Sequence, residues 1–491
     1  MAAASLIAAG GVAGAARAAT QGFGEADVQA IAQALSRRPY RPPAPDLPPA
    51  LAALSYDAYR DIRFSPDQGL WKREGLPFQL QFFHRGGYFK ERVDLYEVRD
   101  GRASPIPYSP GQFSFQGGVP AGVSPGLGFA GFRIHAALNR PDYFDEVAVF
   151  LGAAYFRAVA RDMLYGLSAR GLSIGTGGVE EFPAFRAFWI ARPAPAATSL
   201  TVLALMDGPS CAAAFRFVIT PGAVTTFDTT ARIFPRRAID NVGIAPLTSM
   251  YLFGGEGSGR FDDFRPQVHD SDGLAMANGG GERLWRPLTN PAFVQTSAFA
   301  DDSPRGFGLM QRERAFTAYQ DLEAHYEKRP SLWVEPRGAW GAGSVRLVEL
   351  PSREEVNDNI AAFWTPRAPL MPGVPADFAY RLSWGDAPQP PARPLAAVLQ
   401  TRSGQGSAAE RRRFVLDFDL PPADLTPAVT AQVVASAGVV SAVTLHSNSE
   451  RQAARVSFEL DPGASRAVEL RAALQRAGKP CSEVWLFRWT A

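Results

Sequence analysis

The chain has 491 residues, of which 46% are hydrophobic and 20% charged, and its formal net charge at pH 7 is +2. A chain of this length is too long for one ordinary hydrophobic core, so we expect two or three domains. The near balance of charge excludes a large nucleic-acid-binding surface, which requires a clear excess of Lys and Arg.

The first twenty residues, MAAASLIAAGGVAGAARAAT, carry no charge before Arg17. The apolar stretch over residues 5–16 is too short to span a bilayer, and the small residues Ala16, Ala18 and Ala19 suit signal cleavage. The basic segment that normally precedes such a stretch is missing, so either the true start lies further upstream or the signal is weak. We interpret residues 1–19 as an export segment and expect no membrane-spanning helix elsewhere.

The sequence EADVQAIAQAL at residues 25–35 repeats apolar residues at helical spacing and predicts a short helix, and a second is expected after Pro49. Beyond it, apolar and polar residues alternate between Gly and Pro, as in short strands. Clear examples are TVLALMDG (201–208), AAAFRFVITPG (212–222) and VTTFDTTARIF (224–234). Many short strands with few helices predict an all-β protein built from antiparallel sandwiches.

The segment RPQVHDSDGL at residues 265–274 stands out because it lies among strand-like sequences, which are poor in Asp and Gly. It places two carboxylates, Asp270 and Asp272, on either side of Ser271 and next to His269. A solvated turn explains these residue types. Taken alone, these residues favour the solvated turn over the alternative, a catalytic loop, and the rest of the chain has to decide between the two.

The segment GDAPQPPARP at residues 385–394 has four prolines and no apolar period. Proline-rich segments are stiff and extended, as interdomain linkers are. We therefore expect a large β-sandwich domain over residues 20–384, a linker over 385–394, and a small domain over 395–491 of the size of an immunoglobulin-like sandwich.

Several long motifs occur in a fixed order, among them GFAGFRIH, YGLSARGLSI, RPQVHDSDGL, KRPSLWVEP and DNIAAFW. In these motifs the chain closely resembles the periplasmic glucan biosynthesis proteins G and D (OpgG/OpgD, or MdoG/MdoD), from about Phe23 to Trp489. The resemblance implies a periplasmic protein of osmoregulated glucan metabolism and a homodimer. It also implies a large mutarotase-like β-sandwich followed by a small immunoglobulin-like β-sandwich.

Members of this family resemble anomer-inverting glycoside hydrolases that act on β-1,2-glucan. The resemblance implies that Asp358 in the DNI motif is the general acid, that Asp270 in the HDSD motif is the general base, and that Tyr326 takes part in a proton relay. This division suits an inverting mechanism, in which one carboxylic acid protonates the leaving oxygen and one carboxylate activates water. A general acid needs a desolvated site, and the apolar residues 360–364 are expected to supply it.

The resemblance also implies a set of residues that bind glucan: Tyr155, Arg157, Tyr165, Arg170, Lys328, Arg329, Trp333 and Glu335. Tyr and Trp combine an apolar face with a polar tip, which suits sugar rings, whereas the charged residues bind hydroxyl groups. Burial in the core is the competing interpretation for the aromatic residues, and structural ion pairs for the charged ones. His269 either orients Asp270 or is a satisfied core histidine, and Asp272 is expected to cap the loop.

One departure bears on activity. D-type members resemble this chain up to TRSG and then carry a longer loop with tryptophans, whereas here TRSGQGSAAERRRF leads directly into the next strand. Three functions stay open: an endo-β-1,2-glucanase-like hydrolase, an inverting transglycosylase that cyclises or branches the glucan, and a glucan-binding scaffold without turnover. The first is the main expectation.

No metal or cofactor is expected. Only five histidines occur, and none is paired at the spacing of zinc ligands. The glycine-rich segments do not connect a strand to a helix as phosphate-binding loops do. The two cysteines, Cys211 and Cys481, either form a disulfide, which an exported protein permits, or stay free.

Overall fold

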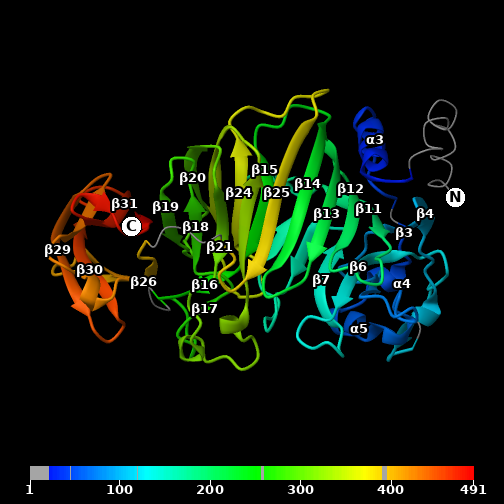
Figure 1. Ribbon diagram of the computed structural model, residues 1–491, viewed down its shortest axis with the longest axis horizontal. Coiled ribbons are helices and arrows are strands. Elements are labelled where there is room, and N and C mark those ends of the chain that lie inside the picture. Colours follow the sequence, from blue (N-terminus) through cyan, green and yellow to red (C-terminus); the bar gives the residue numbers. More distant parts are fainter. Residues whose placement is uncertain (1–21, 45, 119, 256–258, 390–394) are drawn as a thin grey trace.

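The computed structural model describes residues 22–44, 46–118, 120–255, 259–389 and 395–491 (Figure 1). The expected export segment and residues 390–394 of the expected linker lie outside these ranges. The all-β prediction is confirmed, because strands make up nearly all of the regular structure. Among the described residues the α-helices are short and precede the sheets: α3 (Glu25–Ser36), α4 (Pro49–Ala52) and α5 (Tyr56–Arg60).

Helix α3 forms where the apolar period predicted it. Its first turn is capped by Asp27, whose side chain accepts a 2.8 Å hydrogen bond from the Gly24 N–H. Its buried face, with Val28 and Ala32, packs on the outer surface of strands β12, β13 and β14. The second predicted helix is realised as the two short helices α4 and α5.

Two large sheets face each other. The first contains, in spatial order, β2 (Phe78–His84), β6 (Phe129–Ala136), β7 (Asp145–Leu151), β8 (Tyr155–Ala158), β9 (Ser168–Arg170), β15 (Val242–Ser249), β24 (Ile360–Pro366), β23 (Ala342–Glu349) and β20 (Gln295–Asp302), with β10 (Leu172–Ile174) also paired to β15.

The second sheet runs through β28 (Val429–Ala435), β31 (Ala467–Arg476), β33 (Val484–Thr490), β19 (Arg283–Pro287), β18 (Gly273–Ala277), β21 (Gly306–Met310), β22 (Ser331–Arg337), β25 (Ala376–Gly385), β14 (Thr225–Pro235), β13 (Cys211–Thr220), β12 (Leu200–Asp207), β11 (Ala184–Ala191), β3 (Asp94–Arg99) and β4 (Arg102–Pro105), with β32 (Lys479–Pro480) paired to β31. Smaller sheets pair β1 (Ile62–Phe64) with β5 (Phe113–Phe115), and β16 (Tyr251–Phe253) with β17 (Val268–His269).

Aromatic side chains fill the space between the two large sheets. Phe150 stacks on Phe132 and Phe156, with ring centroids 5.2 Å and 5.3 Å apart, and Phe227 lies 4.8 Å from Trp384. These residues come from alternate positions of their strands, so the same alternation that predicts strands also supplies the core. Their burial provides much of the hydrophobic stabilisation of this sandwich.

Residues 395–491 form a second sandwich, called here the C-terminal sandwich. One of its sheets contains β26 (Val398–Gln405), β27 (Arg412–Phe418), β30 (Ala453–Asp461) and β29 (Val439–Asn448), and it packs on β28, β31 and β33 around a separate core. Strand β33 pairs in parallel with β19, with Trp285 opposite Trp485. The second large sheet therefore continues into the C-terminal sandwich, which lies at the left of Figure 1.

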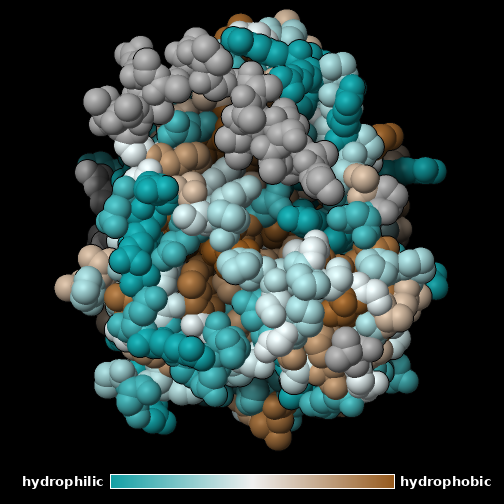
Figure 2. Space-filling model, turned by 90° about the vertical axis from the view of Figure 1, so that its right-hand side faces the viewer, coloured by the Kyte–Doolittle hydropathy of each residue, from teal (hydrophilic) through white to brown (hydrophobic). Residues whose placement is uncertain are grey.

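Figure 2 views the end of the molecule that carries α3 to α5, where hydrophilic residues cover most of the visible surface and hydrophobic ones appear mainly in recesses. Within the described ranges, none of the helices has the length and apolar character needed to cross a membrane. Cys211 and Cys481 are both free, so of the two possibilities for the cysteines the structure has the unpaired one.

Candidate active site

A short backbone segment between β15 and β16, residues 249–251, holds two loops together. The Ser249 hydroxyl bonds the Ser271 hydroxyl at 2.8 Å, and the Met250 carbonyl accepts a 2.9 Å hydrogen bond from the Asp270 N–H. The buried side chain of Asn359 bonds both the N–H and the carbonyl of Tyr251, at 2.8 Å and 2.9 Å. The HDSD loop and the DNI loop, which are far apart in sequence, are thereby fixed to one support.

Asp270 is buried, with 5% of its surface exposed, and its carboxylate pairs with the guanidinium of Arg329. Burial raises the pKa of Asp270 above its ordinary value, and the charges of Arg329 and Arg157 oppose that rise. The nearby Asp358 adds to it. The two carboxylates predicted as acid and base are therefore close enough to influence each other, although 88 positions separate them (358 minus 270).

Asp358 lies in the loop that leads into β24. Its side chain keeps 29% of its surface exposed, and Oδ2 lies 3.8 Å from Nη2 of Arg157. The expectation that residues 360–364 desolvate this carboxyl is not met. These residues belong to β24 and are buried in the sandwich, whereas Asp358 precedes the strand and stays partly exposed.

Tyr326 is buried on the far side of Arg329. The Arg329 guanidinium lies 4.3 Å from the centre of the Tyr326 ring, and the Tyr326 hydroxyl donates a 3.0 Å hydrogen bond to Glu355. Glu355 also pairs with Arg265 at 2.7 Å. Asp270 is thus linked to Glu355, in the same loop as Asp358, by an ion pair to Arg329, a cation–π contact between Arg329 and Tyr326, and the hydrogen bond from Tyr326.

Strands β8 and β9, called here the β8–β9 wall, lie next to Asp358, which is 3.8 Å from Arg157 of β8. The electrostatic influence of Asp358 reaches Tyr155 on β8, and the guanidinium of Arg170 lies 4.9 Å from the Tyr155 ring. Arg170 is buried and pairs with Glu180 at 2.7 Å, yet its Nε and Nη2 have no partner among the described residues. Two buried donors next to an aromatic ring suit the hydroxyl groups and apolar face of a sugar.

The remaining predicted binding residues divide into two groups. Tyr165 is partly buried and lies near Arg157. The exposed residue Lys328 lies beside it in space, because the Lys328 carbonyl accepts a hydrogen bond from the Leu164 N–H. Trp333, with 1% of its surface exposed, is a core residue instead. Its ring lies against β21, where Gly306 and Gly308 have no side chain to exclude it.

Glu335 pairs with Arg337 at 2.7 Å, on β22 opposite Arg381. The pair between Glu335 and Arg337 agrees with the alternative interpretation, in which the charged residues form structural ion pairs. The expectation that Trp333 and Glu335 bind glucan is therefore not supported by their positions, because the first has no free face and the second is already paired within its own strand.

His269 is a satisfied core residue rather than a free base. Nδ1 bonds Gln311 at 2.8 Å and Nε2 bonds Gln267 at 2.9 Å, and burial lowers the pKa of His269 to about 4. Gln311 also donates to the carbonyls of His269 and Tyr326, at 2.9 Å and 3.1 Å. It thus ties the base loop to the segment that carries Tyr326 and Arg329.

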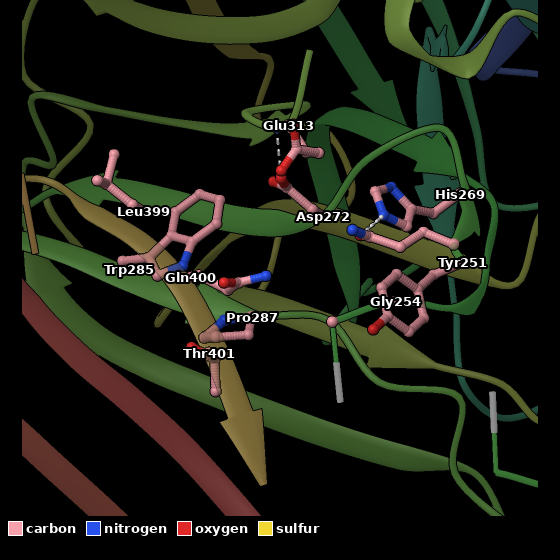
Figure 3. Close-up of a pocket in the computed structure, with 12 residues that line it drawn as sticks. Tyr251, Gly254, His269, Asp272, Trp285, Pro287, Glu313, Leu399, Gln400 and Thr401 are labelled. Atoms are coloured by element: carbon pink, nitrogen blue, oxygen red, sulfur yellow. Dashed lines mark hydrogen bonds between the residues drawn. The ribbon is translucent and has the colours of Figure 1, made fainter. Parts of the chain in front are cut away.

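Asp272 caps a loop, as expected. Oδ2 accepts hydrogen bonds from the N–H groups of Arg312 and Glu313, at 3.0 Å and 3.1 Å. Figure 3 shows Asp272 and Glu313 at one side of a cavity whose other side is formed by Leu399, Gln400 and Thr401 of β26. Burial raises the pKa of Asp272 to about 6, against the opposing charge of Arg312.

Sequence reasoning missed Asn359, Gln311 and the acidic partner Glu355. Their residue types gave no signal, because Asn and Gln act here by bonding backbone groups that only the fold brings near. The described residues contain no group of three His, Cys, Asp or Glu side chains arranged to hold a metal ion.

Known proteins resemble this chain over nearly its whole length. The family model described as periplasmic glucan biosynthesis protein, MdoG, matches residues 23–489. The chain is 52% identical over 473 residues to glucans biosynthesis protein G of Rhodopseudomonas palustris strain BisA53, covering 95% of this chain and 93% of the relative. It is 48% identical to the proteins of the same name from Bradyrhizobium diazoefficiens and Vibrio cholerae serotype O1, over 95% and 96% of this chain and 93% and 87% of those relatives.

Proposed function

The chain belongs to the periplasmic glucan biosynthesis protein family MdoG, and from this premise we propose that it is an anomer-inverting glycoside hydrolase acting on the β-1,2-glucan backbone. The observation that carries the proposal is that two carboxylates in different environments lie near each other. Asp270 is buried and paired with Arg329, whereas the Asp358 side chain is partly exposed. Two carboxylates with different surroundings suit the separate roles of base and acid.

In the proposed reaction, Asp358 gives its proton to the glycosidic oxygen as the bond from that oxygen to the anomeric carbon breaks. Water attacks the anomeric carbon from the opposite face, and its proton passes to Asp270. A glucan chain lying in the cleft would exclude water from Asp358, and this favours the protonated acid. The raised pKa of Asp270 makes it a stronger base once it is ionised, and Arg329 stabilises the ionised form.

Substrate contacts in this proposal come from the β8–β9 wall. Tyr155 supplies an aromatic face, and the unpartnered donors of Arg170 bind sugar hydroxyls. Arg157, on the same strand β8 as Tyr155, lies 3.8 Å from the Asp358 carboxylate and orients the acid. Tyr326 is buried behind Arg329 and serves as a relay residue only if substrate draws its hydroxyl away from Glu355.

Transfer to a sugar hydroxyl is a second candidate function, and one observation favours it. The connection between β26 and β27 spans only residues 406–411, so this part of the C-terminal sandwich supplies no long loop to cover a cleft. An open cleft admits a sugar hydroxyl as readily as water, and the same acid and base would then form a new glycosidic bond. We further propose that the chain is exported to the periplasm and acts there as a homodimer.

Incubation of the purified protein with linear β-1,2-glucan, followed by mass spectrometry of the products, tests the proposed function. Hydrolysis yields shorter chains whose masses include one added water per cleavage. Rings lack the water of a linear chain, so products of cyclic mass would assign transfer instead. Unchanged glucan that nevertheless binds the protein would contradict both activities and identify a scaffold.

A further inference from the structure

Asp272 connects the base loop to the segment of residues 310–313, which borders the C-terminal sandwich. It lies two residues after Asp270 in the same loop, and its backbone N–H donates a 2.8 Å hydrogen bond to the Met310 carbonyl. Its carboxylate accepts the N–H groups of Arg312 and Glu313. The segment around residue 312 therefore fixes the position of the loop that carries the proposed base.

The side chain of Arg312 extends from this segment into the C-terminal sandwich. Its two terminal nitrogens bond the two oxygens of Glu483, at 2.8 Å and 2.9 Å, and Nη1 also donates to the Val398 carbonyl at 2.8 Å. Glu483 in turn accepts a 3.0 Å hydrogen bond from the Val398 N–H. The guanidinium lies 3.6 Å from the centre of the Trp285 ring, so a bidentate and stacked contact fixes its orientation.

A small cavity of about 50 Å³ lies beside this contact, between Asp272 and β26. Asp272 Oδ1 and Gln400 Oε1 are buried, and neither oxygen has a hydrogen-bond partner among the described residues. Two acceptors cannot bond each other, but a water molecule donates to both. The volume is sufficient for a few waters, so a water bridge between the base loop and the C-terminal sandwich fits this space.

We propose that Glu483 of the C-terminal sandwich is a positioning residue for the base loop, acting through Arg312 and Asp272. Docking of the sandwich orients Arg312, the N–H groups at 312 and 313 hold Asp272, and Asp272 keeps Asp270 in place two residues away. The claim that Glu483 positions the loop does not depend on the protein being an enzyme. Its consequence for catalysis rests on the proposed function.

The direct test is backbone hydrogen exchange in the full chain, compared between wild type and Glu483→Ala. We expect exchange in peptides covering 268–274 and 310–313 to become at least about tenfold faster, because the segment that holds Asp272 loses its anchor. Glu483→Gln keeps an acceptor for the Val398 N–H and one contact to Arg312, so it should show a smaller acceleration. If Glu483→Ala does not fold, Glu483→Gln carries the same test.

Glu459→Gln is the matched control. Glu459 is a buried carboxylate that pairs with Arg413 at 2.6 Å and also bonds Ser407. Both partners belong to the C-terminal sandwich and not to the base loop. It should alter exchange in its own strands and leave 268–274 unchanged. Equal acceleration of 268–274 in the Glu459 and Glu483 variants, or no acceleration in either Glu483 variant, would overturn the proposal.

Kinetics separate this proposal from the proposed function. If wild type cleaves β-1,2-glucan, the Glu483 variants should lower kcat about tenfold and change KM less than about twofold, because the binding wall on β8 and β9 is untouched. An unchanged kcat with faster loop exchange would overturn the catalytic consequence. An inactive wild type would refute the proposed function, while the exchange result alone would decide whether Glu483 positions the loop.

Discussion

The side chain of Asn359 bonds both backbone polar groups of Tyr251: Oδ1 accepts the Tyr251 N–H at 2.8 Å and Nδ2 donates to the Tyr251 carbonyl at 2.9 Å. A third bond reaches the Leu350 carbonyl at 3.0 Å. Because Asn359 follows Asp358 directly and Met250 binds the Asp270 N–H, adjacent residues of one strand segment hold the proposed acid and the proposed base. The relative position of the two carboxylates thus depends on backbone bonds rather than on contact between their side chains.

Asn359→Ala should therefore weaken both stability and activity. It removes three side-chain hydrogen bonds to the backbone of Tyr251 and Leu350, which costs roughly 2–4 kcal/mol in the free energy of unfolding. Turnover of glucan should fall further than the loss of folded protein explains, because Asp358 is no longer fixed. Urea unfolding and kcat measure the two effects. Asn139→Ala is the control, since Asn139 also bonds backbone, accepting the Asp162 N–H at 2.8 Å, and equal effects of both variants on kcat would contradict this account.

Asp358→Asn should remove most activity on natural glucan while leaving folding and glucan binding nearly intact. Asn keeps the shape of the side chain but has no acidic proton to donate, and general acid catalysis contributes roughly two to four powers of ten in rate. An activated aryl glycoside, if the cleft accepts it, needs less protonation and should restore much of the rate. Asp270→Asn should show no such recovery. Comparable rates of Asp358→Asn and wild type on natural glucan would remove Asp358 from the mechanism.

The sequence predicted the fold class correctly, and the family resemblance singled out Asp270 and Asp358 as candidates, but neither predicted how these two residues are held. Alternating apolar residues such as Phe215, Phe217 and Phe227 identify strands and core together, because the strand period places them on one face. The support of the site depends on Ser249, Met250 and Asn359. Their contacts join segments far apart in the chain, and a local pattern cannot predict such contacts.

Stability should depend on pH through Asp272. Burial raises its pKa from 3.8 to about 6, while Arg312, Arg314 and the N–H group of Glu313 lower it. A carboxyl whose pKa is higher in the folded state stabilises the fold below its unfolded pKa, and this contribution is lost as the pH rises through about 6.

Asp272→Asn cannot ionise, so its stability relative to wild type should increase between pH 4 and pH 8. The rise from 3.8 to about 6 limits the increase to about 3 kcal/mol. Urea midpoints of both proteins at several pH values measure this difference in stability. Burial lowers the pKa of His269, which gives the opposite pH dependence. That contribution is present in both proteins and cancels in the difference. A difference that is constant with pH would show that Asp272 is not desolvated as described.

Arg170→Lys should raise KM for glucan more than it lowers kcat. Lys keeps the positive charge near Glu180 but loses the planar set of donors, two of which are buried without a partner among the described residues. We expect an increase in KM of about tenfold, on the order of 1.4 kcal/mol. Arg381→Lys is the control, because Arg381 pairs bidentately with Asp228 on the strands β25 and β14. The binding role of Arg170 is refuted if both variants change KM equally.

Tryptophan illustrates where prediction from residue type fails. Trp333 lies in the KRPSLWVEP motif and has the side chain of a sugar platform, yet it packs against Gly306 and Gly308 in the core. Trp333 is a core residue because the glycines of the neighbouring strand leave room for its ring. The sequence does not show which strand is the neighbour, and only the pairing of β21 with β22 identifies it.

The central claim is that Asp358 and Asp270 act as acid and base in an inverting cleavage. The most direct test is proton NMR of the reducing ends released from linear β-1,2-glucan, recorded before mutarotation equalises the anomers. Attack by water on the face opposite the β-linked leaving group must give the α-anomer first, and Asp270→Asn should release none. Initial release of the β-anomer would mean retention through a covalent intermediate and would contradict the account.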